Sequence, residues 1–264
     1  MSRIFAVVNQ KGGVGKSTTA EAMCAGLAQR GYAVLAVDLD AQGNLTYTFG
    51  AAGAAGDSGA TGATGASGAT VLDALTGRSP AQDAIRHTPD GDILPSSRHL
   101  SGADAFLTQT GKEYRLREAL APVRDRYDFL VVDTPPALGI LTVNALTACD
   151  SVIIPAQADI YSLQGIEQLA ETIQPVRKYT NPSLSIAGIL LTRYSPRSVL
   201  SREIACLTDR LAETLGTKRF QTTIREAVAV REAQLSRQPL FRYAPKAKVT
   251  QDYSRFLAEL LGEE

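Results

Sequence analysis

The residues best suited to chemistry stand near the amino terminus, in the run GGVGKS at positions 12–17. Glycines allow positive φ angles, so successive backbone N–H groups can turn toward one anion at the start of a helix. Lys16 can then reach the outer phosphate oxygens of a nucleotide, and the Ser17 hydroxyl can occupy one position on Mg²⁺. The run therefore predicts a phosphate-binding loop. The alternative is a glycine-rich turn without a ligand.

Carboxylates follow two other apolar runs. Asp38 and Asp40 come after residues 33–37, and Asp133 ends the run FLVVD at 129–133. In an open parallel sheet, ligands bind beyond the carboxyl ends of the strands, so these side chains are expected beside the phosphate-binding loop. We expect Asp133 to hold a water of the Mg²⁺ shell and Asp38 to support the lysines of the loop. The alternative for Asp38 and Asp40 is that they merely cap a turn.

The surrounding sequence must place these residues on a sheet. An apolar run at 4–8 enters the loop, and a helical pattern then continues to Arg30 and stops at Gly31. Apolar strand patterns and helical patterns then alternate along the chain, with strands at 33–37, 129–133, 151–155 and 186–192 and a helix at 163–176. This alternation predicts an α/β fold, a doubly wound and mainly parallel sheet with helices on both faces. We expect a single domain over 1–264, with a flexible Gly/Ala-rich insert at 51–70.

The loop departs from the general pattern G-x-x-x-x-G-K-[ST], because Gln10 replaces the first glycine and Lys11 lies inside the loop. It resembles the deviant Walker A loop K-G-G-x-G-K-[ST] of the ParA/MinD group of P-loop ATPases. The run NQKGGVGKST is most similar to the ParA (Soj) DNA-partition branch. Residues 38–44, DLDAQGN, resemble the switch I of that family, although Ala41 stands where the family usually has proline. Residues 133–136, DTPP, are similar to its switch II.

The resemblance implies a slow ATPase in which two ATP-bound subunits face each other and each Lys11 reaches the phosphates of the partner. It implies that Asp40 positions the attacking water, that the dimer binds DNA non-specifically, and that a ParB-type partner stimulates hydrolysis. The cofactors are expected to be ATP and Mg²⁺. The site residues expected on this basis are Lys11, Lys16 and Asp40 for catalysis; Lys11, Gly12, Gly13, Val14, Gly15, Lys16, Ser17, Thr18, Thr192 and Arg193 for ATP; and Ser17, Asp40 and Asp133 for the metal.

The charge of the chain is balanced overall but uneven locally. Its 27 Lys and Arg match its 27 Asp and Glu, so any nucleic-acid site must be local. From Gly216 onward basic residues dominate, and the acids expected to face them are only Glu226 and Glu232. The family run I-P-R-N-V-R is largely replaced here, so DNA contacts cannot be transferred directly, and a solvated basic face is the alternative. The residues expected to contact DNA are Arg219, Arg225, Arg231, Lys246 and Lys248.

The sequence also bears on location and on competing functions. It shows no signal peptide and no apolar run of roughly 20 residues, so we expect a cytoplasmic protein without stable membrane association. The resemblance to the DNA-partition branch implies that it is nucleoid-associated. Residues 253–261 form an amphipathic helix with one basic residue, which favours core packing over lipid contact. The alternatives are a MinD-like membrane-surface ATPase and a metabolic P-loop enzyme. A further alternative is an electron-donating relative of the nitrogenase iron protein. Such a protein needs paired cluster cysteines across a dimer, and the cysteine to consider for this role is Cys149, which lies after switch II.

Overall fold

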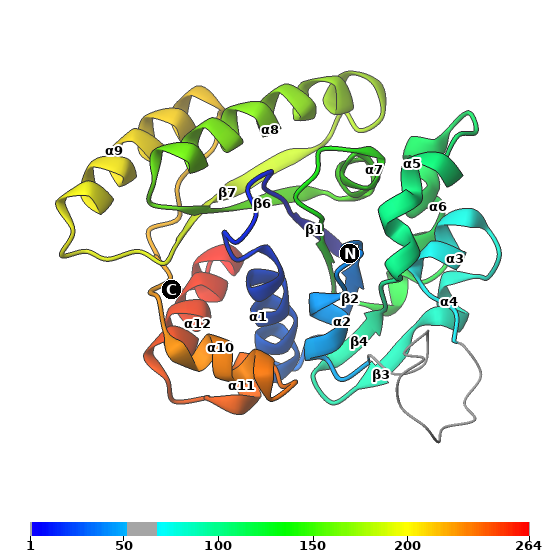
Figure 1. Cartoon of the computed structure of the whole chain (residues 1–264), viewed down its shortest axis with the longest axis horizontal. Helices are drawn as coiled ribbons and strands as arrows, with labels where there is room; N and C mark the ends of the chain where they lie inside the picture. The colour runs from blue at the N-terminus through cyan, green and yellow to red at the C-terminus, as the bar shows by residue number, and fades with distance from the viewer. Residues whose placement is uncertain (1, 52–67, 264) are drawn as a thin grey trace.

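The computed structural model describes residues 2–51 and 68–263, so most of the insert expected at 51–70 lies outside the described residues. The described residues form one seven-stranded sheet in the order β3-β4-β2-β5-β1-β6-β7 (Figure 1). Every pairing is parallel except that of β3 with β4. The strands are β1 (Arg3–Val7), β2 (Val34–Asp38), β3 (Arg86–Thr88), β4 (Gly91–Leu94), β5 (Phe129–Asp133), β6 (Ser151–Gln157) and β7 (Ser185–Thr192). The doubly wound, mainly parallel sheet predicted from the sequence is confirmed.

Helices cover both faces of this sheet (Figure 1). One apolar core joins the sheet to α1 (Lys16–Gln29), α2 (Asn44–Thr48), α10 (Val228–Leu235), α11 (Leu240–Tyr243) and α12 (Lys248–Leu261). The opposite core includes side chains of α3 (Val71–Thr76), α4 (Ala81–Ala84), α5 (Ala103–Phe106), α6 (Arg115–Leu120), α7 (Ile140–Ala148), α8 (Ile160–Tyr179) and α9 (Val199–Thr214). Short 3-10 helices, η1 (Arg98–Gly102), η2 (Lys112–Tyr114) and η3 (Arg124–Arg126), lie in the connections.

The strand register brings the chemistry-bearing residues to one edge of the sheet. The apolar residues of β1, β2 and β5 are buried because helices cover both faces, which explains their nearly continuous hydrophobic runs. Val7 pairs with Asp133, and Asp38 pairs with the same residue from the other side. The phosphate-binding loop that follows β1 is therefore flanked by the ends of β5 and β6.

The carboxy-terminal helix α12 packs into the core against α1. Phe256 and Leu257 are fully buried. A Cβ atom on Gly26 of α1 would lie 2.5 Å from a side-chain atom of Leu257 and 2.8 Å from one of Phe241, so any larger residue at this position would require these side chains to shift. The expected core packing of residues 253–261 is confirmed. Among the helices described, we find none with the length and apolar character needed to cross a membrane.

Candidate functional site: a phosphate-binding loop beside three strand ends

The loop between β1 and α1 has the backbone that its glycines predict. Gly13 and Gly15 have φ angles of 76° and 90°, and Gly15 is the residue that precedes the first turn of α1. Two neighbouring strand ends anchor the loop. Gln157 Nε2 donates to the Gly13 carbonyl at 2.8 Å, and Thr192 Oγ1 donates to the Val14 carbonyl at 2.8 Å. The loop is thereby fixed by β6 and β7, with its helix N-terminus available to an anion.

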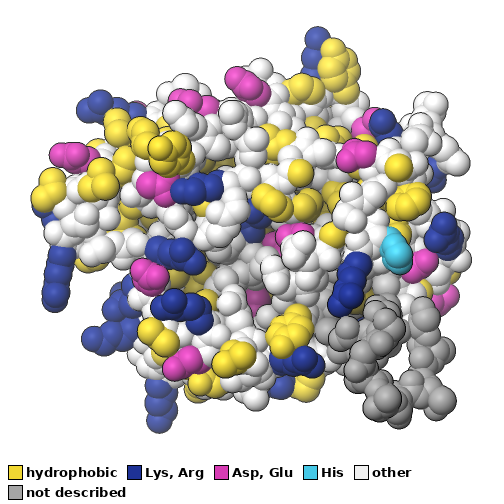
Figure 2. All heavy atoms as spheres, in the orientation of Figure 1, with side chains coloured by type: hydrophobic (Ala, Val, Ile, Leu, Met, Phe, Trp, Pro, Cys, Tyr) yellow, Lys and Arg dark blue, Asp and Glu magenta, His cyan; other side chains and the backbone are white. Residues whose placement is uncertain are grey.

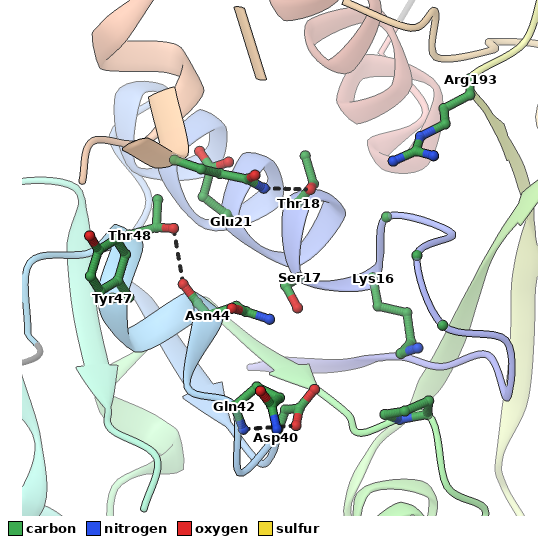
Figure 3. A pocket seen from close by; sticks show the side chains of 15 residues that line it. Lys16, Ser17, Thr18, Glu21, Asp40, Gln42, Asn44, Tyr47, Thr48 and Arg193 are labelled. Atoms are coloured by element: carbon green, nitrogen blue, oxygen red, sulfur yellow. Dashed lines mark hydrogen bonds between the residues drawn. The ribbon is translucent and has the colours of Figure 1, made fainter. Parts of the chain in front are cut away.

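The loop opens onto a cavity of about 480 Å³ near the centre of the face shown in Figure 2. The cavity is large enough for a nucleotide and lies at the carboxyl ends of the parallel strands, where open α/β sheets bind ligands. Figure 3 shows Arg193, from the end of β7, turned toward the cavity from the side opposite Tyr47 and Asn44. The other residues lining it include Gly12, Gly13, Gly15, Lys16, Ser17, Thr18, Glu21, Asp40, Gln42, Thr48, Pro136 and Gln234.

Lys16 and Asp133 are buried charged groups next to this cavity. The Nζ of Lys16 donates to the Lys11 carbonyl at 3.1 Å. Burial lowers the pKa of Lys16, while the charges of Asp133 and Asp40 oppose that change. Burial raises the pKa of Asp133 well above its usual range and the Asp38 charge raises it further, whereas Ser17 and Lys16 act against the rise.

Both carboxylate oxygens of Asp133 are buried, and no donor among the described residues meets the full geometry of a hydrogen bond to them, although the Ser17 side chain is close enough to lower the pKa of Asp133. Buried polar atoms in native proteins are nearly always paired, so such an orphaned carboxylate needs an explanation. Oxygen donors are the ligands that Mg²⁺ prefers, often through its own waters, and a cation here would also lower the repulsion with Asp38. The donor set therefore fits the expected metal site with Ser17 and Asp133.

The loop after β2 brings Asp40 to the cavity and holds Asp38 away from it. Asp40 is 8% exposed and lines the cavity, and its Oδ1 accepts a hydrogen bond from Gln42 N at 3.0 Å. Asp38 accepts from Thr46 N at 2.8 Å, from Thr46 Oγ1 at 2.7 Å and from Asp40 N at 3.1 Å. We expected Asp38 to support the lysines of the loop, and this expectation is wrong. Asp38 instead braces the turn that presents Asp40.

Lys11 pairs with an acidic residue that the sequence analysis missed. Its Nζ lies 2.6 Å from Asp159 Oδ2, and the two side chains are 28% and 31% exposed. Asp159 also accepts from Ser162 N at 2.9 Å, which caps α8. Burial alone would raise the pKa of Asp159, but the bonds from Lys11 and Ser162 lower it overall. The sequence did hold a signal for Asp159, because it is another acidic residue just after a strand, β6, as Asp40 is after β2.

Of the two residues expected to contact adenine, only Arg193 lines this cavity. Arg193 lines it and has a positive φ of 48°, whereas Thr192 is buried and uses its hydroxyl to hold Val14. Both residues also line a second cavity of about 170 Å³ together with Ile224 and Gln234. This cavity adjoins the first, because Gly15, Thr18, Arg193 and Gln234 line both. Adenine contact by Thr192 and Arg193 stays a prediction.

Fewer positive charges of the basic segment after Gly216 are available for DNA than its sequence indicated. Arg219 pairs with Asp209 at 2.8 Å, and Arg225 makes a two-point pair with Asp252 on α12, whose side chain is 2% exposed. Our count of Glu226 and Glu232 as the nearby acids was therefore wrong, because Asp209 and Asp252 also neutralise two of the candidate arginines. In the described part of the chain, no ion pair involves the exposed side chains of the remaining candidates, Arg231, Lys246 and Lys248.

Comparison with known proteins identifies the family to which this chain belongs. The family model described as an AAA domain matches residues 2–186. The chain is 38% identical to the chromosome partitioning protein ParA of Caulobacter vibrioides over 267 residues, covering 99% of this chain and 95% of that protein. The chain belongs to the ParA/Soj family of P-loop partition ATPases. It is also 37% identical to the sporulation initiation inhibitor protein Soj of Bacillus subtilis, covering 96% of each chain.

A solved structure with bound ligands has the same fold as this chain. Cobyrinic acid a,c-diamide synthase from Mycobacterium smegmatis, with bound ADP and magnesium, is 33% identical to this chain. The TM-score is 0.75, and the match covers 99% of this chain and 94% of that one. The ParA/Soj resemblance expected from the loop and the strand-end carboxylates is confirmed by these comparisons.

The iron-sulfur alternative receives no support from the cysteines. Cys149 is 2% exposed, and burial raises the pKa of its thiol. A cluster shared between two subunits needs accessible thiolates, so a buried, protonated Cys149 is unsuited to that role. Cys24 is likewise buried, while Cys206 is exposed on α9.

Proposed function

We propose that this chain is a Mg²⁺-dependent ATPase that segregates DNA, as the family to which it belongs indicates. The observation that carries the proposal is the orphaned carboxylate of Asp133 beside Lys16 and Ser17, at the base of a loop whose backbone is set to bind phosphates. ATP would place its phosphates against residues 12–18. Its base would lie toward Thr192 and Arg193, at the junction of the two cavities.

The side chains of the site have separate tasks in hydrolysis. Lys16 is already partly desolvated, so it would stabilise the charge that develops on the transferring phosphoryl group more strongly than an exposed lysine could. Asp40, held by the turn that Asp38 braces, would orient the attacking water. Mg²⁺, when held by Ser17 and Asp133, with Asp40 near its water shell, supplies further charge neutralisation.

Lys11 would complete the site of a second subunit. Its pair with Asp159 is partly exposed on both sides, and such pairs contribute only about 0–1 kcal/mol. A triphosphate offers more negative charge than one carboxylate, so Lys11 can exchange Asp159 for the phosphates of a facing subunit. ATP would thus favour an ATP-dependent homodimer, and hydrolysis would return the chain to monomers.

The proposed dimer would bind non-specific DNA and work at the nucleoid in the cytoplasm. Because Arg219 and Arg225 are held by acids, the contacts to DNA phosphates should come mainly from Arg231, Lys246 and Lys248. A ParB-type centromere-binding protein would stimulate an otherwise slow ATPase. We propose no stable membrane association, because the apolar face of α12 is used by the core.

The ATPase test measures phosphate release with and without non-specific DNA and a candidate ParB-type protein. We expect a slow basal rate that rises when both are present. A rate that stays unchanged with every candidate partner, or that is unaffected by removing Mg²⁺, would contradict the proposal.

The DNA test compares two variants with the same change in charge. Lys246→Glu with Lys248→Glu reverses two exposed cations at the start of α12. Arg117→Glu with Arg126→Glu does the same on the opposite face of the sheet. The first should lower DNA affinity and reduce the salt dependence by about 0.9 for each lost phosphate contact. Equal losses in both variants would show that net charge, rather than this surface, binds DNA.

A second candidate function is a metabolic P-loop enzyme, which the likeness to the Mycobacterium smegmatis synthase favours. The DNA measurement separates the two, because a small-molecule enzyme would show no ATP-dependent retention of DNA. The MinD-like alternative predicts ATP-dependent flotation with liposomes, which the buried apolar face of α12 argues against.

A further inference from the structure

One glutamine side chain stands where the two cavities of the nucleotide site meet. Gln234 lies near the end of α10, is exposed, and lines both the larger and the smaller cavity. Its Nε2 donates to Thr18 Oγ1 on α1 at 3.3 Å, and this bond is drawn to Thr18 in Figure 3. The amide of Gln234 is therefore tied to the helix that carries the phosphate-binding loop.

The end of α10 is anchored on both sides of Gln234. Ala233, its neighbour in the sequence, is 2% exposed and belongs to the apolar core that includes α11 and α12. Arg237 follows α10 and places its guanidinium carbon 4.4 Å from the centroid of the Tyr47 ring, which lines the larger cavity. These contacts present the Gln234 amide at a defined place in the wall of the cavity.

The sugar of a bound nucleotide must pass this place. In the proposed function the phosphates lie against residues 12–18 and the base lies toward Thr192 and Arg193, so the sugar, which joins phosphates to base, lies between them. Four residues line both cavities, namely Gly15, Thr18, Arg193 and Gln234. The sugar therefore comes into reach of these four residues.

The chemistry of the four residues singles out Gln234 as the acceptor for a sugar hydroxyl. Gly15 has no side chain, the guanidinium of Arg193 only donates, and Thr18 Oγ1 already accepts from Gln234. The bond to Thr18 uses Nε2 of the Gln234 amide and leaves its Oε1 as an acceptor. The 2′- and 3′-hydroxyls of ribose are donors that such an oxygen accepts.

We propose that Gln234 binds a ribose hydroxyl of the nucleotide through Oε1 and thereby makes the site prefer ribonucleotides to deoxyribonucleotides. The inference rests on the nucleotide binding proposed above and adds a specificity-determining residue to it. A site that hydrogen-bonds a hydroxyl disfavours the analogue that lacks it, because the acceptor then loses its partner. Since Gln234 is exposed, water replaces part of the lost bond, and the preference is moderate rather than absolute.

The test measures the binding of ADP, 2′-deoxy-ADP and 3′-deoxy-ADP to the full chain with Mg²⁺ by isothermal titration calorimetry. Diphosphates exclude hydrolysis, so the ratio of two dissociation constants reports the hydroxyl contact. Gln234→Met keeps the length of the side chain and removes the amide. Gln238→Met makes the same change at a residue that lines neither cavity. Glu226→Gln changes a carboxylate that lines the smaller cavity alone.

We expect the wild type to bind ADP about three- to tenfold more tightly than one of the two deoxy nucleotides, which identifies the hydroxyl that Gln234 binds. This ratio should fall to about one in Gln234→Met and stay at the wild-type value in Gln238→Met and Glu226→Gln.

Equal affinities of the wild type for all three nucleotides would overturn the inference and leave the proposed function standing. So would a Gln234→Met protein that binds all three more weakly by the same factor, because Gln234 would then only hold Thr18 in place. A ratio that falls in Glu226→Gln but not in Gln234→Met would assign the hydroxyl to that carboxylate and overturn the inference as well. A wild type that binds none of the three would instead refute the nucleotide site itself.

Discussion

Glu21 makes the stability of this protein depend on pH in a direction that can be worked out from its surroundings. It lies on α1 at the wall of the nucleotide cavity, is 4% exposed, and its Oε1 accepts a hydrogen bond from Leu240 N at 2.6 Å. Burial raises the pKa of Glu21 from 4.5 to about 8, the Leu240 bond opposes the rise, and the charge of Asp90 adds to it. Asp90 is itself paired with Arg242 at 2.8 Å.

The sign follows from proton binding. Between pH 4.5 and about 8 the folded chain keeps the Glu21 proton while the unfolded chain releases it, so the free energy of unfolding falls as pH rises through this window. At about 1.4 kcal/mol per pH unit, the span from pH 4.5 to pH 7 corresponds to about 3 kcal/mol. Glu21→Gln cannot ionise and keeps an oxygen to accept from Leu240 N, so this loss should disappear in the variant.

Urea unfolding of the wild type and Glu21→Gln at pH 5 and pH 7 measures this difference. The two proteins should be within about 1 kcal/mol of each other at pH 5, and the variant should be more stable by about 3 kcal/mol at pH 7. Glu167→Gln, at an exposed position on α8, is the matched control and should show no such change. A difference between Glu21→Gln and the wild type that is the same at both pH values would refute the reasoning.

The remaining predictions concern the nucleotide site. Asp40→Ala should bind ATP and DNA but hydrolyse ATP poorly, because the turn at β2 would no longer present a carboxylate to the attacking water; wild-type turnover in a phosphate-release assay would remove Asp40 from the catalytic residues. Asp159→Asn can still cap α8 but no longer holds Lys11 by charge, so nucleotide-dependent dimers should form up to about fivefold more tightly. Unchanged or weaker dimerisation of Asp159→Asn in sedimentation would show that the pair does not restrain Lys11.

The sequence was sufficient for the elements whose signals are local. The phosphate-binding loop, the Asp133 strand and the Asp40 turn each combine an apolar run with a chemically distinct end, so their positions at one edge of a parallel sheet follow from the fold class. The core packing of α12 was also predictable, because residues 253–261 carry a single basic residue, Arg255, whereas a lipid-binding helix carries several.

Pairings between distant residues could not be predicted in this way. Arg225 pairs with Asp252, 27 positions away, and Lys11 pairs with Asp159, 148 positions away. The residues next to Arg225 and Lys11 in the sequence do not indicate these partners. The error on Asp38 has the same origin, because the choice between a nearby lysine and Thr46 depends on how the chain turns after β2. Charge counts along a segment therefore overstate its free positive charge.

The most direct test of the central claim is sedimentation of the wild type and Lys11→Ala with Mg²⁺ and a non-hydrolysable ATP analogue, with bound nucleotide measured in the same samples. We predict a wild-type dimer and a Lys11→Ala monomer that still carries nucleotide, because Lys16 and Asp133 remain in place. A wild type that binds no nucleotide or stays monomeric, or a Lys11→Ala protein that dimerises normally, would contradict the account.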